Sequence, residues 1–290
     1  MQLEQEYILS NLGSFELNHI FDCGQCFRRN EQSDWSYTWI FWKNILNIQK
    51  KFDSIIFSWI IDWDIQTIVN QYFDLNRDYD KIKSLLSKVD NYMKESIQYW
   101  HWIRLLNQDL RETIISFIIS ANNNIPRIKW IIERLSQKYW TELDRNGQHY
   151  YTFPTAEQLK DVSISDYRKL WLWFRDERVY TTARMILDGK IDLNLLYKKD
   201  TQTVRNYLLS LSWIWPKVAD CILLFSNLKR LEVFPIDVRV RRIMNELYIH
   251  NPDEAKVNKN QIRKLAHEKF WNYAWLAQEY LFYRARTQKI

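Results

Sequence analysis

Glycine is scarce in this chain of 290 residues. The chain has 4 glycines, whereas a usual content of about 7% would give roughly 20. Glycine takes positive backbone φ angles without steric cost, and a chain of this length needs more such positions than that. Tryptophan is abundant instead, with 15 copies. Where these tryptophans fall is therefore informative.

Cysteine is rare as well. The three cysteines, Cys23, Cys26 and Cys221, argue against a disulfide framework. Cys23 and Cys26 are separated by two residues, but the second pair that a structural zinc site needs is missing. We therefore expect two packed core thiols, no metal and no cofactor.

Long apolar runs are also missing. No stretch reaches 18 apolar residues, and no basic segment precedes an apolar one near Met1. We expect a cytoplasmic protein that does not bind membranes. The hydrophobic content of 47% and the charged content of 26% are ordinary for a globular protein. The net charge of +6 suits a polyanion such as nucleic acid, although many proteins without such a partner share it.

Two hydrophobic patterns follow one another along the chain. Between Tyr37 and Trp63, β-branched and aromatic residues alternate or cluster between short polar breaks, which predicts an antiparallel meander. After Tyr72 the apolar residues recur at helical spacing, and from about Asn107 onward every segment is predicted to be helical. The prediction is an α+β fold with an antiparallel β domain at 1–105 and a mainly α-helical domain at 106–290.

The most informative stretch is a pair of predicted helices joined by a short break. The first covers Thr201–Leu211, and the second begins at Pro216, which suits the first turn of a helix. Such a hairpin exposes backbone N–H groups and a helix N-terminus, which together bind phosphate. Lys217 lies in the first turn, where the helix dipole and apolar neighbours disfavour its ammonium form. It is a candidate amine nucleophile, although an arbitrary lysine is more often a solvated surface residue.

Asp237 follows the extended apolar run that begins at Val233 and precedes another predicted helix. By itself it is most simply an N-cap. Together with the hairpin and Lys217, about 20 residues earlier, it resembles the helix-hairpin-helix DNA glycosylases. Three further segments narrow the resemblance to the 8-oxoguanine glycosylase branch: FDCGQCFR at 21–28, SANNNIPRI at 120–128 and AQEYLF at 277–282. The four-cysteine cluster of the iron–sulfur relatives is absent from the sequence.

This resemblance implies a bifunctional DNA glycosylase that excises 8-oxoguanine from duplex DNA in base excision repair and cleaves the strand as a lyase. Lys217 would attack C1′ of the flipped nucleotide and form an imine, and Asp237 would stabilise the positive charge that develops on the sugar. The carbonyl of Gly24 would accept a hydrogen bond from the N7–H group that oxidised guanine has and guanine lacks.

The resemblance also implies contacts to the extruded base and to the rest of the DNA. Phe282 would stack on the base, Gln278 would bond to its Watson–Crick edge, and Cys221 would pack against its other face. Taken singly, Phe282 and Cys221 could be core residues and Gln278 a surface amide. The residues expected to bind DNA are Asn122, Arg127, Phe174, Arg175, Trp213, Trp215 and Arg239. Among these, Asn122 would fill the gap in the base stack, Arg127 and Arg175 would donate to the unpaired cytosine, and Arg239 would contact a phosphate.

The expected partner is double-stranded DNA containing oxidised guanine, bound by a monomer. Two alternatives stay open. One is a non-catalytic DNA-binding helix-hairpin-helix protein. The other is a glycosylase for another damaged base, such as an alkylated one, which Gly24 and Phe282 together disfavour.

The hairpin departs from the resemblance at Trp213 and Trp215. Relatives have glycine at both positions, because only glycine lets the backbone approach phosphate with the required φ. Further tryptophans stand where glycine or a small residue is expected, at Trp100, Trp102, Trp140, Trp173, Trp271 and Trp275. Each inserts a very large side chain where space is short. A simpler hypothesis is that the gene uses UGA for glycine and was translated with a code that reads UGA as tryptophan.

Overall fold

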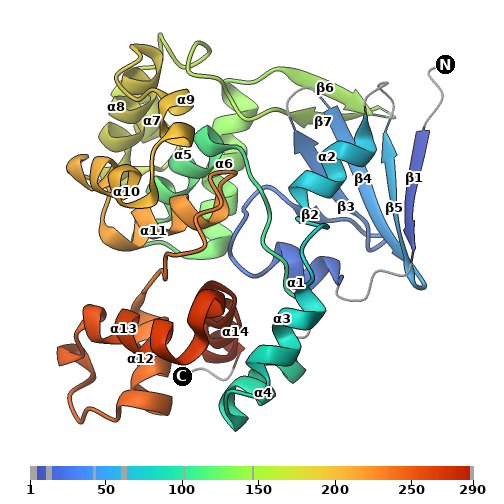
Figure 1. The fold of residues 1–290 in the computed structure, drawn as a ribbon. Coiled ribbons are helices and arrows are strands. Elements are labelled where there is room, and N and C mark those ends of the chain that lie inside the picture. The colour runs from blue at the N-terminus through green and yellow to red at the C-terminus, as the bar shows by residue number, and fades with distance from the viewer. Residues whose placement is uncertain are drawn as a thin grey trace. The chain divides into compact units, whose positions relative to one another are not determined.

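The computed structural model describes residues 5–10, 15–41, 44–59, 64–100, 102–145 and 147–287. Figure 1 shows an antiparallel sheet formed by the N-terminal part of the chain and helices formed by most of the remainder. The α+β class predicted from the change of hydrophobic period is confirmed. None of the helices in the described part of the chain has the length and apolarity needed to span a membrane.

The strands and helices have the following bounds. The strands are β1 (Gln5–Ser10), β2 (Asn30–Glu31), β3 (Tyr37–Phe41), β4 (Asn44–Lys51), β5 (Ser54–Trp59), β6 (Glu142–Arg145) and β7 (Gln148–Tyr151). The α-helices are α1 (Leu17–Phe21), α2 (Ile65–Tyr72), α3 (Tyr79–Leu86), α4 (Asn91–Tyr99), α5 (Leu110–Ser120), α6 (Ile125–Lys138), α7 (Ile164–Lys169), α8 (Asp176–Leu187), α9 (Leu193–Lys198), α10 (Thr201–Ser210), α11 (Pro216–Phe225), α12 (Val238–Met244), α13 (Lys259–Phe270) and α14 (Ala274–Thr287). Short helical turns are η1 (Trp173–Arg175), η2 (Asn245–Ile249), η3 (Glu254–Lys256) and η4 (Trp271–Tyr273).

The larger sheet has the order β1-β5-β4-β3-β2, with every neighbouring pair antiparallel. Along β4 the residues alternate, so that Leu46 and Ile48 are fully buried while Ile45 and Asn47 are half-buried. This alternation is the period of two that the sequence predicts between Tyr37 and Trp59. Residues 60–63, which complete the predicted meander, lie outside the described residues.

The prediction that every segment after about Asn107 is helical was wrong at β6 and β7. These two short strands form a separate antiparallel pair. The side chain of Arg145 donates to the carbonyls of Ile45 and Ser58, at 3.5 and 3.0 Å, and so ties the pair to the larger sheet. The strands are only four residues long and mostly polar, so they carry too little hydrophobic alternation to be recognised. The available signal was the turn glycine Gly147, which has φ 76°.

The chain packs into two compact units that do not follow one linear boundary. The first unit comprises residues 1–12, 26–70 and 108–199, and the second comprises 13–25, 71–107 and 200–290. The predicted boundary at 105/106 therefore separates segments that pack together. Aromatic contacts explain why, because Trp100 lies 3.9 Å from Tyr283 and Tyr79 lies 6.1 Å from Trp275, measured between ring centroids. Such long-range ring contacts cannot be read from hydrophobic periodicity.

Within the first unit, α5 is a buried helix that packs against α6 and α8. The Asn124 side chain caps α6 by accepting a hydrogen bond from the Arg127 N–H at 3.0 Å. Within the second unit, α14 is buried on nearly all sides and packs against α4, α12 and α13. A helix buried all round must bring its polar side chains into the interior, so these residues need a reason to be there.

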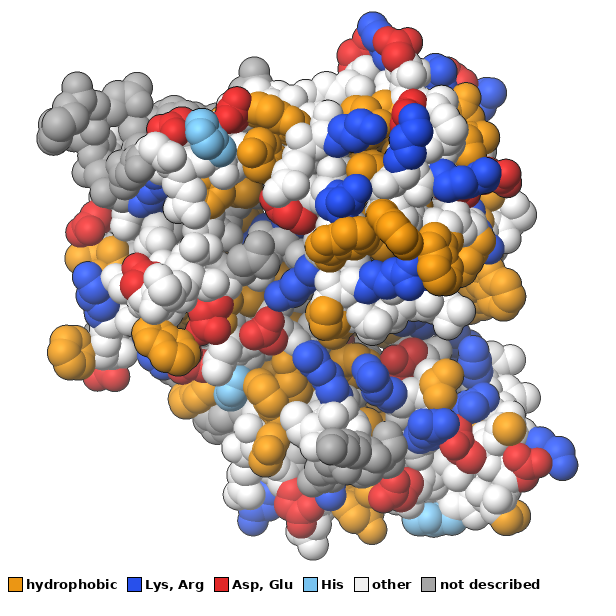
Figure 2. Space-filling view, turned by 180° about the vertical axis from the view of Figure 1, so that it is seen from behind, with side chains coloured by type: hydrophobic (Ala, Val, Ile, Leu, Met, Phe, Trp, Pro, Cys, Tyr) orange, Lys and Arg blue, Asp and Glu red, His pale blue; other side chains and the backbone are white. Residues whose placement is uncertain are grey.

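The surface mixes charge and apolar groups. Figure 2 shows a face on which Lys and Arg side chains are interspersed with hydrophobic ones. Several of the exposed large hydrophobic side chains are tryptophans: Trp35, Trp130, Trp171, Trp173, Trp215 and Trp271. Aromatic and basic groups presented together are typical of surfaces that bind nucleic acid.

Candidate active site

The α10–α11 hairpin forms as predicted in the second unit. The turn is held by hydrogen bonds from Leu211 N–H to Leu208 O at 3.2 Å and from Ile214 N–H to Leu211 O at 2.9 Å. Pro216 occupies the first turn of α11, and Trp215 is the N-cap residue without a side-chain cap. The first turn of α11 therefore has no side-chain acceptor for its N–H groups, which is the condition for anion binding at a helix start.

Lys217 is half-buried in the first turn of α11 and bonds to the side chain of Cys221, one turn further along. Burial lowers the pKa of Lys217, but the interactions of Lys217 with Cys221, Asp237 and Glu279 together outweigh burial, so that the pKa is raised. The prediction that the surroundings of Lys217 disfavour its ammonium form was therefore wrong. Sequence reasoning counted the helix dipole and the apolar neighbours, but it missed the carboxylates that other helices bring close.

Cys221 itself is a thiol at neutral pH, because burial raises its pKa to about 12. All three cysteines are buried and free of disulfide bonds, so the predicted packed thiols at Cys23 and Cys26 are confirmed. Within the described part of the chain, no group of three or more His, Cys, Asp and Glu side chains is arranged to hold a metal ion.

Asp237 caps α12, as the sequence predicts. Its carboxylate accepts a hydrogen bond from the Val240 N–H at 2.8 Å. The same carboxylate interacts electrostatically with Lys217 and Glu279. A capping hydrogen bond fixes the orientation of this carboxylate. Asp237 is thus a rigidly held negative charge near the Lys217 amine.

Glu279 is a residue of this cluster that sequence reasoning missed. It is 2% exposed on α14, and its Oε2 atom is buried without a hydrogen-bond partner. Burial raises its pKa to about 8, against the opposing effects of Lys217 and of a hydrogen bond with Cys23. The available signal was a carboxylate next to Gln278 inside the mostly apolar run AWLAQEYLFY.

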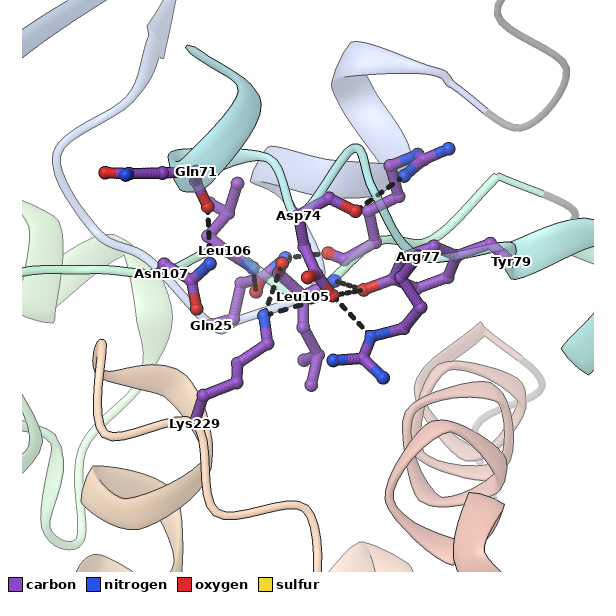
Figure 3. A network of polar contacts seen from close by, with 10 residues as sticks. Gln25, Gln71, Asp74, Arg77, Tyr79, Leu105, Leu106, Asn107 and Lys229 are labelled. Carbon is purple, nitrogen blue, oxygen red and sulfur yellow. Dashed lines mark hydrogen bonds and ion pairs between the residues drawn. The ribbon is translucent and has the colours of Figure 1, made fainter. Parts of the chain in front are cut away.

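Gly24, the expected acceptor for the oxidised base, lies in a tightly held segment and has φ 88°. The neighbouring Gln25 is buried, and its amide donates to the carbonyls of Ile20 at 2.9 Å and Arg104 at 2.7 Å. Its amide oxygen accepts from the Leu106 N–H at 2.8 Å, as Figure 3 shows. Gln25 thus fixes the backbone on the C-terminal side of Gly24.

A polar network continues from this segment to the loop after α11 (Figure 3). The ammonium group of Lys229 donates to the carbonyl of Leu105 at 2.8 Å and lies 3.6 Å from the Asp74 carboxylate. Asp74 also pairs with Arg77 at 2.6 Å and accepts from the Tyr79 hydroxyl at 2.9 Å. Burial lowers the pKa of Lys229 to about 8. The network joins the segment next to Gly24 to the end of the helix that carries Lys217.

The two expected base-binding residues of α14 have different surroundings. Gln278 is 4% exposed, and its Oε1 atom is buried without a hydrogen-bond partner. Phe282, one turn further, is half-buried. The guanidinium of the exposed Arg239, for which a phosphate contact is expected, lies 5.9 Å from the centre of the Phe282 ring. The second unit contains all of these residues: Gly24, Lys217, Cys221, Asp237, Arg239, Gln278, Phe282 and both hairpin tryptophans.

The remaining expected DNA-binding residues belong to the first unit. Asn122 is exposed just after α5 and has φ 50°. Arg175 is buried, and its guanidinium donates to the carbonyls of Ala121 and Asn122, each at 2.7 Å. In this structure Arg175 holds the turn that presents Asn122.

Arg127 and Phe174 each take part in a contact between an aromatic ring and a guanidinium. The guanidinium of Arg127 lies 4.3 Å from the centre of the Trp173 ring. Phe174 is about half exposed, and the guanidinium groups of Arg175 and Arg178 lie 4.2 and 4.9 Å from its ring centre. This surface of the first unit offers a partner both positive charge and stacking faces.

Comparison with known proteins agrees with this arrangement. Residues 7–114 match the family described as "8-oxoguanine DNA glycosylase, N-terminal domain", and residues 115–268 match the family "HhH-GPD superfamily base excision DNA repair protein". The N-glycosylase/DNA lyase of Saccharomyces cerevisiae is 34% identical over 175 residues, which is 56% of this chain and 45% of the yeast protein. The chain thus matches less than half of that relative. A probable N-glycosylase/DNA lyase of Methanothermobacter thermautotrophicus is 29% identical over 75% of this chain and 74% of its own length.

The solved structure of the 8-oxoguanine glycosylase/lyase of Clostridium acetobutylicum, in complex with double-stranded DNA containing cytosine opposite 8-oxoguanine, is 36% identical and covers 100% of both chains with a TM-score of 0.91. The 3-methyladenine DNA glycosylase of Archaeoglobus fulgidus, with 16% identity and a TM-score of 0.80, shares the fold alone. The chain therefore belongs to the HhH-GPD superfamily of base excision DNA repair proteins and, within it, to the 8-oxoguanine DNA glycosylases. The family predicted from the four sequence motifs is confirmed.

Proposed function

We propose that this protein excises 8-oxoguanine from duplex DNA and then cleaves the strand at the abasic site, with Lys217 as the nucleophile. The observation that carries the proposal is the electrostatic interaction between Lys217, in the first turn of α11, and Asp237, at the start of α12, in a chain of the 8-oxoguanine glycosylase family. A lysine and a fixed carboxylate in this arrangement supply a nucleophile and a charge that stabilises a cationic sugar.

The reaction follows from these two groups. The neutral amine of Lys217 attacks C1′ of the flipped nucleotide, the bond between C1′ and N9 breaks, and its electron pair leaves with the base. Asp237 stabilises the positive charge on the sugar during this step. The sugar ring then opens to an imine between C1′ and Lys217. The imine acidifies the C2′ hydrogens, and the 3′ phosphate leaves by β-elimination.

The base is recognised by groups of the second unit. The Gly24 carbonyl accepts from N7–H of the oxidised base, Gln278 bonds to the Watson–Crick edge, and Phe282 and Cys221 pack on its two faces. Two observations support these roles: Gln25 fixes the backbone next to Gly24, and the Gln278 Oε1 atom has no hydrogen-bond partner. A single hydrogen bond contributes only about 1 kcal/mol, so rejection of guanine also requires the energetics of base extrusion.

The rest of the duplex is bound by residues of both units. Asn122 fills the gap left by the base, Arg127 donates to the unpaired cytosine and Phe174 adds a stacking face, while Arg175 supports this surface by holding the turn at Asn122. The hairpin residues 213–216 and Arg239 contact phosphates. The protein acts as a monomer in the cytoplasm, and no cofactor enters the reaction as written.

The test is excision from a panel of matched duplexes that contain 8-oxoguanine opposite cytosine, guanine opposite cytosine, or 3-methyladenine opposite thymine. The chain as printed is assayed beside its Trp213→Gly/Trp215→Gly variant, because two indoles at the hairpin obstruct phosphate. Release of 8-oxoguanine alone supports the proposal. Release of 3-methyladenine instead favours the glycosylase for another base, and binding to all duplexes without any release favours the non-catalytic alternative.

A further inference from the structure

Four tryptophans stand at positive backbone φ, where L residues other than Asn, Asp and His are rare. They are Trp35 (φ 63°), Trp171 (φ 66°), Trp173 (φ 53°) and Trp271 (φ 50°). Among the described residues nine non-glycine positions have positive φ, so tryptophan fills four of nine although it makes up 15 of 290 residues. The three described glycines also all have positive φ. Tryptophan therefore occupies the conformations that glycine occupies elsewhere in the chain.

The turn around Trp35 has the form of a glycine turn. It joins β2 to β3, with hydrogen bonds from Gln32 N–H to Ser36 O at 2.7 Å and from Trp35 N–H to Gln32 O at 3.1 Å. Asp34 precedes Trp35 and accepts from the Ser36 hydroxyl at 2.7 Å. The pair Asp-Gly is among the strongest signals for such hairpin turns, and here Trp35 takes the place of its glycine.

Two further positions lie just after helices, where glycine is the common terminator. Trp171 follows the C-cap of α7, and its N–H donates to Arg168 O at 3.0 Å. Trp271 follows α13 and has φ 50° with ψ −136°. That combination lies outside the left-handed region that L residues can occupy, where ψ is about +30° to +60°. Only glycine takes it without strain.

The side chains at these positions contribute too little stability to offset the strain of the backbone. The four indoles are between 53% and 76% exposed, so they add little to the core. A large aromatic ring is normally retained for the area it buries. The positive φ angles and the exposure of the indoles therefore both favour glycine at these positions.

We infer that positions 35, 171, 173 and 271 carry glycine in the protein that its own cell makes, read from UGA codons. Backbone conformation does not extend this inference to the hairpin. The expectation that Trp213 and Trp215 need positive φ was wrong, because neither is among the positive-φ residues and Trp215 has φ −88°. At these two positions only the space needed for a phosphate still favours glycine.

Peptide mass spectrometry of the protein purified from its own cells tests this inference. Trypsin releases residues 170–175, which read LWLWFR in the printed sequence. We expect the mass of LGLGFR, while the tryptophan-free peptide LLNQDLR of residues 105–111 keeps its printed mass. Sequencing the coding DNA gives the matching observation, UGA at all four codons. UGG codons or tryptophan masses at these positions would overturn the inference.

Glu279 is a second feature that the proposed reaction does not use. The titratable groups that interact with it are Lys217 and Cys221 on α11, Asp237 at the start of α12, Cys23 after α1 and Tyr283 on α14 itself. Its Oε2 atom is buried without a hydrogen-bond partner, whereas the nearby Asp237 carboxylate already accepts from Val240 N–H. A buried carboxylate oxygen without a donor is costly, and such groups often mark functional sites.

Lys217 must lose a proton before it can attack, because an ammonium nitrogen has no free electron pair. We propose that Glu279, in the fraction of molecules in which its carboxyl is ionised, takes this proton, and so acts as a positioning residue for the nucleophile. The proton moves from Nζ to a carboxylate oxygen of Glu279, and the freed electron pair of Nζ forms the bond to C1′. Asp237 keeps its negative charge for the sugar. This assignment rests on the proposed role of Lys217.

The test is single-turnover excision of 8-oxoguanine by a Glu279→Gln variant between pH 6 and 9. We expect the variant to be about tenfold slower than the parent at pH 7 and about a hundredfold slower near pH 9, because Glu279 of the parent loses its proton over this range and only its ionised form can act as a base. The exposed Glu268→Gln on α13 is the matched control and should keep the parent profile. An unchanged profile in Glu279→Gln, or a loss that is the same at every pH, would overturn this assignment. Failure of the nucleophile itself is separately visible, because Lys217→Gln would then still form a covalent adduct.

Discussion

Arg205 and Asp220 form an ion pair of 2.7 Å that joins the two helices of the hairpin. Asp220 is almost fully buried and also lies 3.1 Å from Arg263 on α13. Replacing Asp220 by Ala leaves two partly buried guanidinium groups without a carboxylate. We expect a loss of about 3 kcal/mol in the free energy of unfolding, measured by urea denaturation.

The control is Glu268→Ala, which removes an exposed partner of Lys264 and should change the free energy of unfolding by less than about 0.5 kcal/mol. A loss below about 1 kcal/mol for Asp220→Ala would show that the pair does not hold the hairpin.

Asp237 has a capping role and an electrostatic role, and two substitutions separate them. Asn at position 237 keeps the acceptor for Val240 N–H but removes the charge, so we expect near-parent stability with severely impaired excision. Ala removes both, and should cost about 1 kcal/mol of stability as well. Thermal unfolding and single-turnover excision measure the two effects. Parent-like excision by Asp237→Asn would contradict the role of the charge.

The pH dependence of stability reports on Glu279. Burial raises its pKa in the folded protein to about 8 from an ordinary value of 4.5. The folded state therefore keeps a proton that the unfolded chain releases, and the stability present below pH 4.5 is lost as pH rises through 8. Relative to Glu279→Gln, the free energy of unfolding of the parent should fall by up to about 1.4 kcal/mol for each pH unit between the two pKa values. Parallel urea denaturation of both proteins at pH 5, 6, 7 and 8 measures the difference, and parallel curves would contradict the buried carboxyl.

Trp171→Gly should stabilise the printed chain, because it relieves positive φ at a helix terminus. The expected gain is about 1 kcal/mol, or a rise of roughly 2–4 °C in Tm. Trp130→Gly is the matched control, since Trp130 is also exposed but lies within α6, where glycine costs about 1 kcal/mol. Differential scanning calorimetry compares the two. A lower Tm for Trp171→Gly would mean that the indole of Trp171 stabilises the protein by more than the strained backbone destabilises it.

Short-range signals in the sequence were sufficient to predict the hairpin and the starts of its neighbouring helices. Pro216 marks the start of α11 and Asp237 the start of α12 because each acts within one helical turn. The raised pKa of Lys217 and the presence of Glu279 could not be predicted in this way. The pKa of Lys217 depends on the combined effects of Cys221, Asp237 and Glu279, and the position of Glu279 depends on α14 packing against α12, a contact that sequence spacing does not reveal.

The period of the hydrophobic residues also could not predict that each unit is built from separate segments of the chain. Hydrophobic period gives the type of an element but not its partner, so residues 71–105 are predicted to belong with the sheet, whereas they pack with 200–290. The hypothesis that glycine belongs at tryptophan positions agrees with the structure at some of them and not at others. Trp173 and Trp271 have the positive φ that favours glycine, whereas Trp275 is buried against Tyr79.

Borohydride trapping tests the nucleophile most directly. A duplex with 8-oxoguanine opposite cytosine is incubated with the Trp213→Gly/Trp215→Gly chain, with and without the further change Lys217→Gln, and imines are reduced to stable adducts. We expect a covalent protein–DNA adduct, mapped to Lys217 by peptide mass spectrometry, and none above background in Lys217→Gln. DNA binding should change by less than about tenfold, because only one of several positive groups is lost. An adduct in Lys217→Gln, or excision by that variant at the parent rate, would contradict the account.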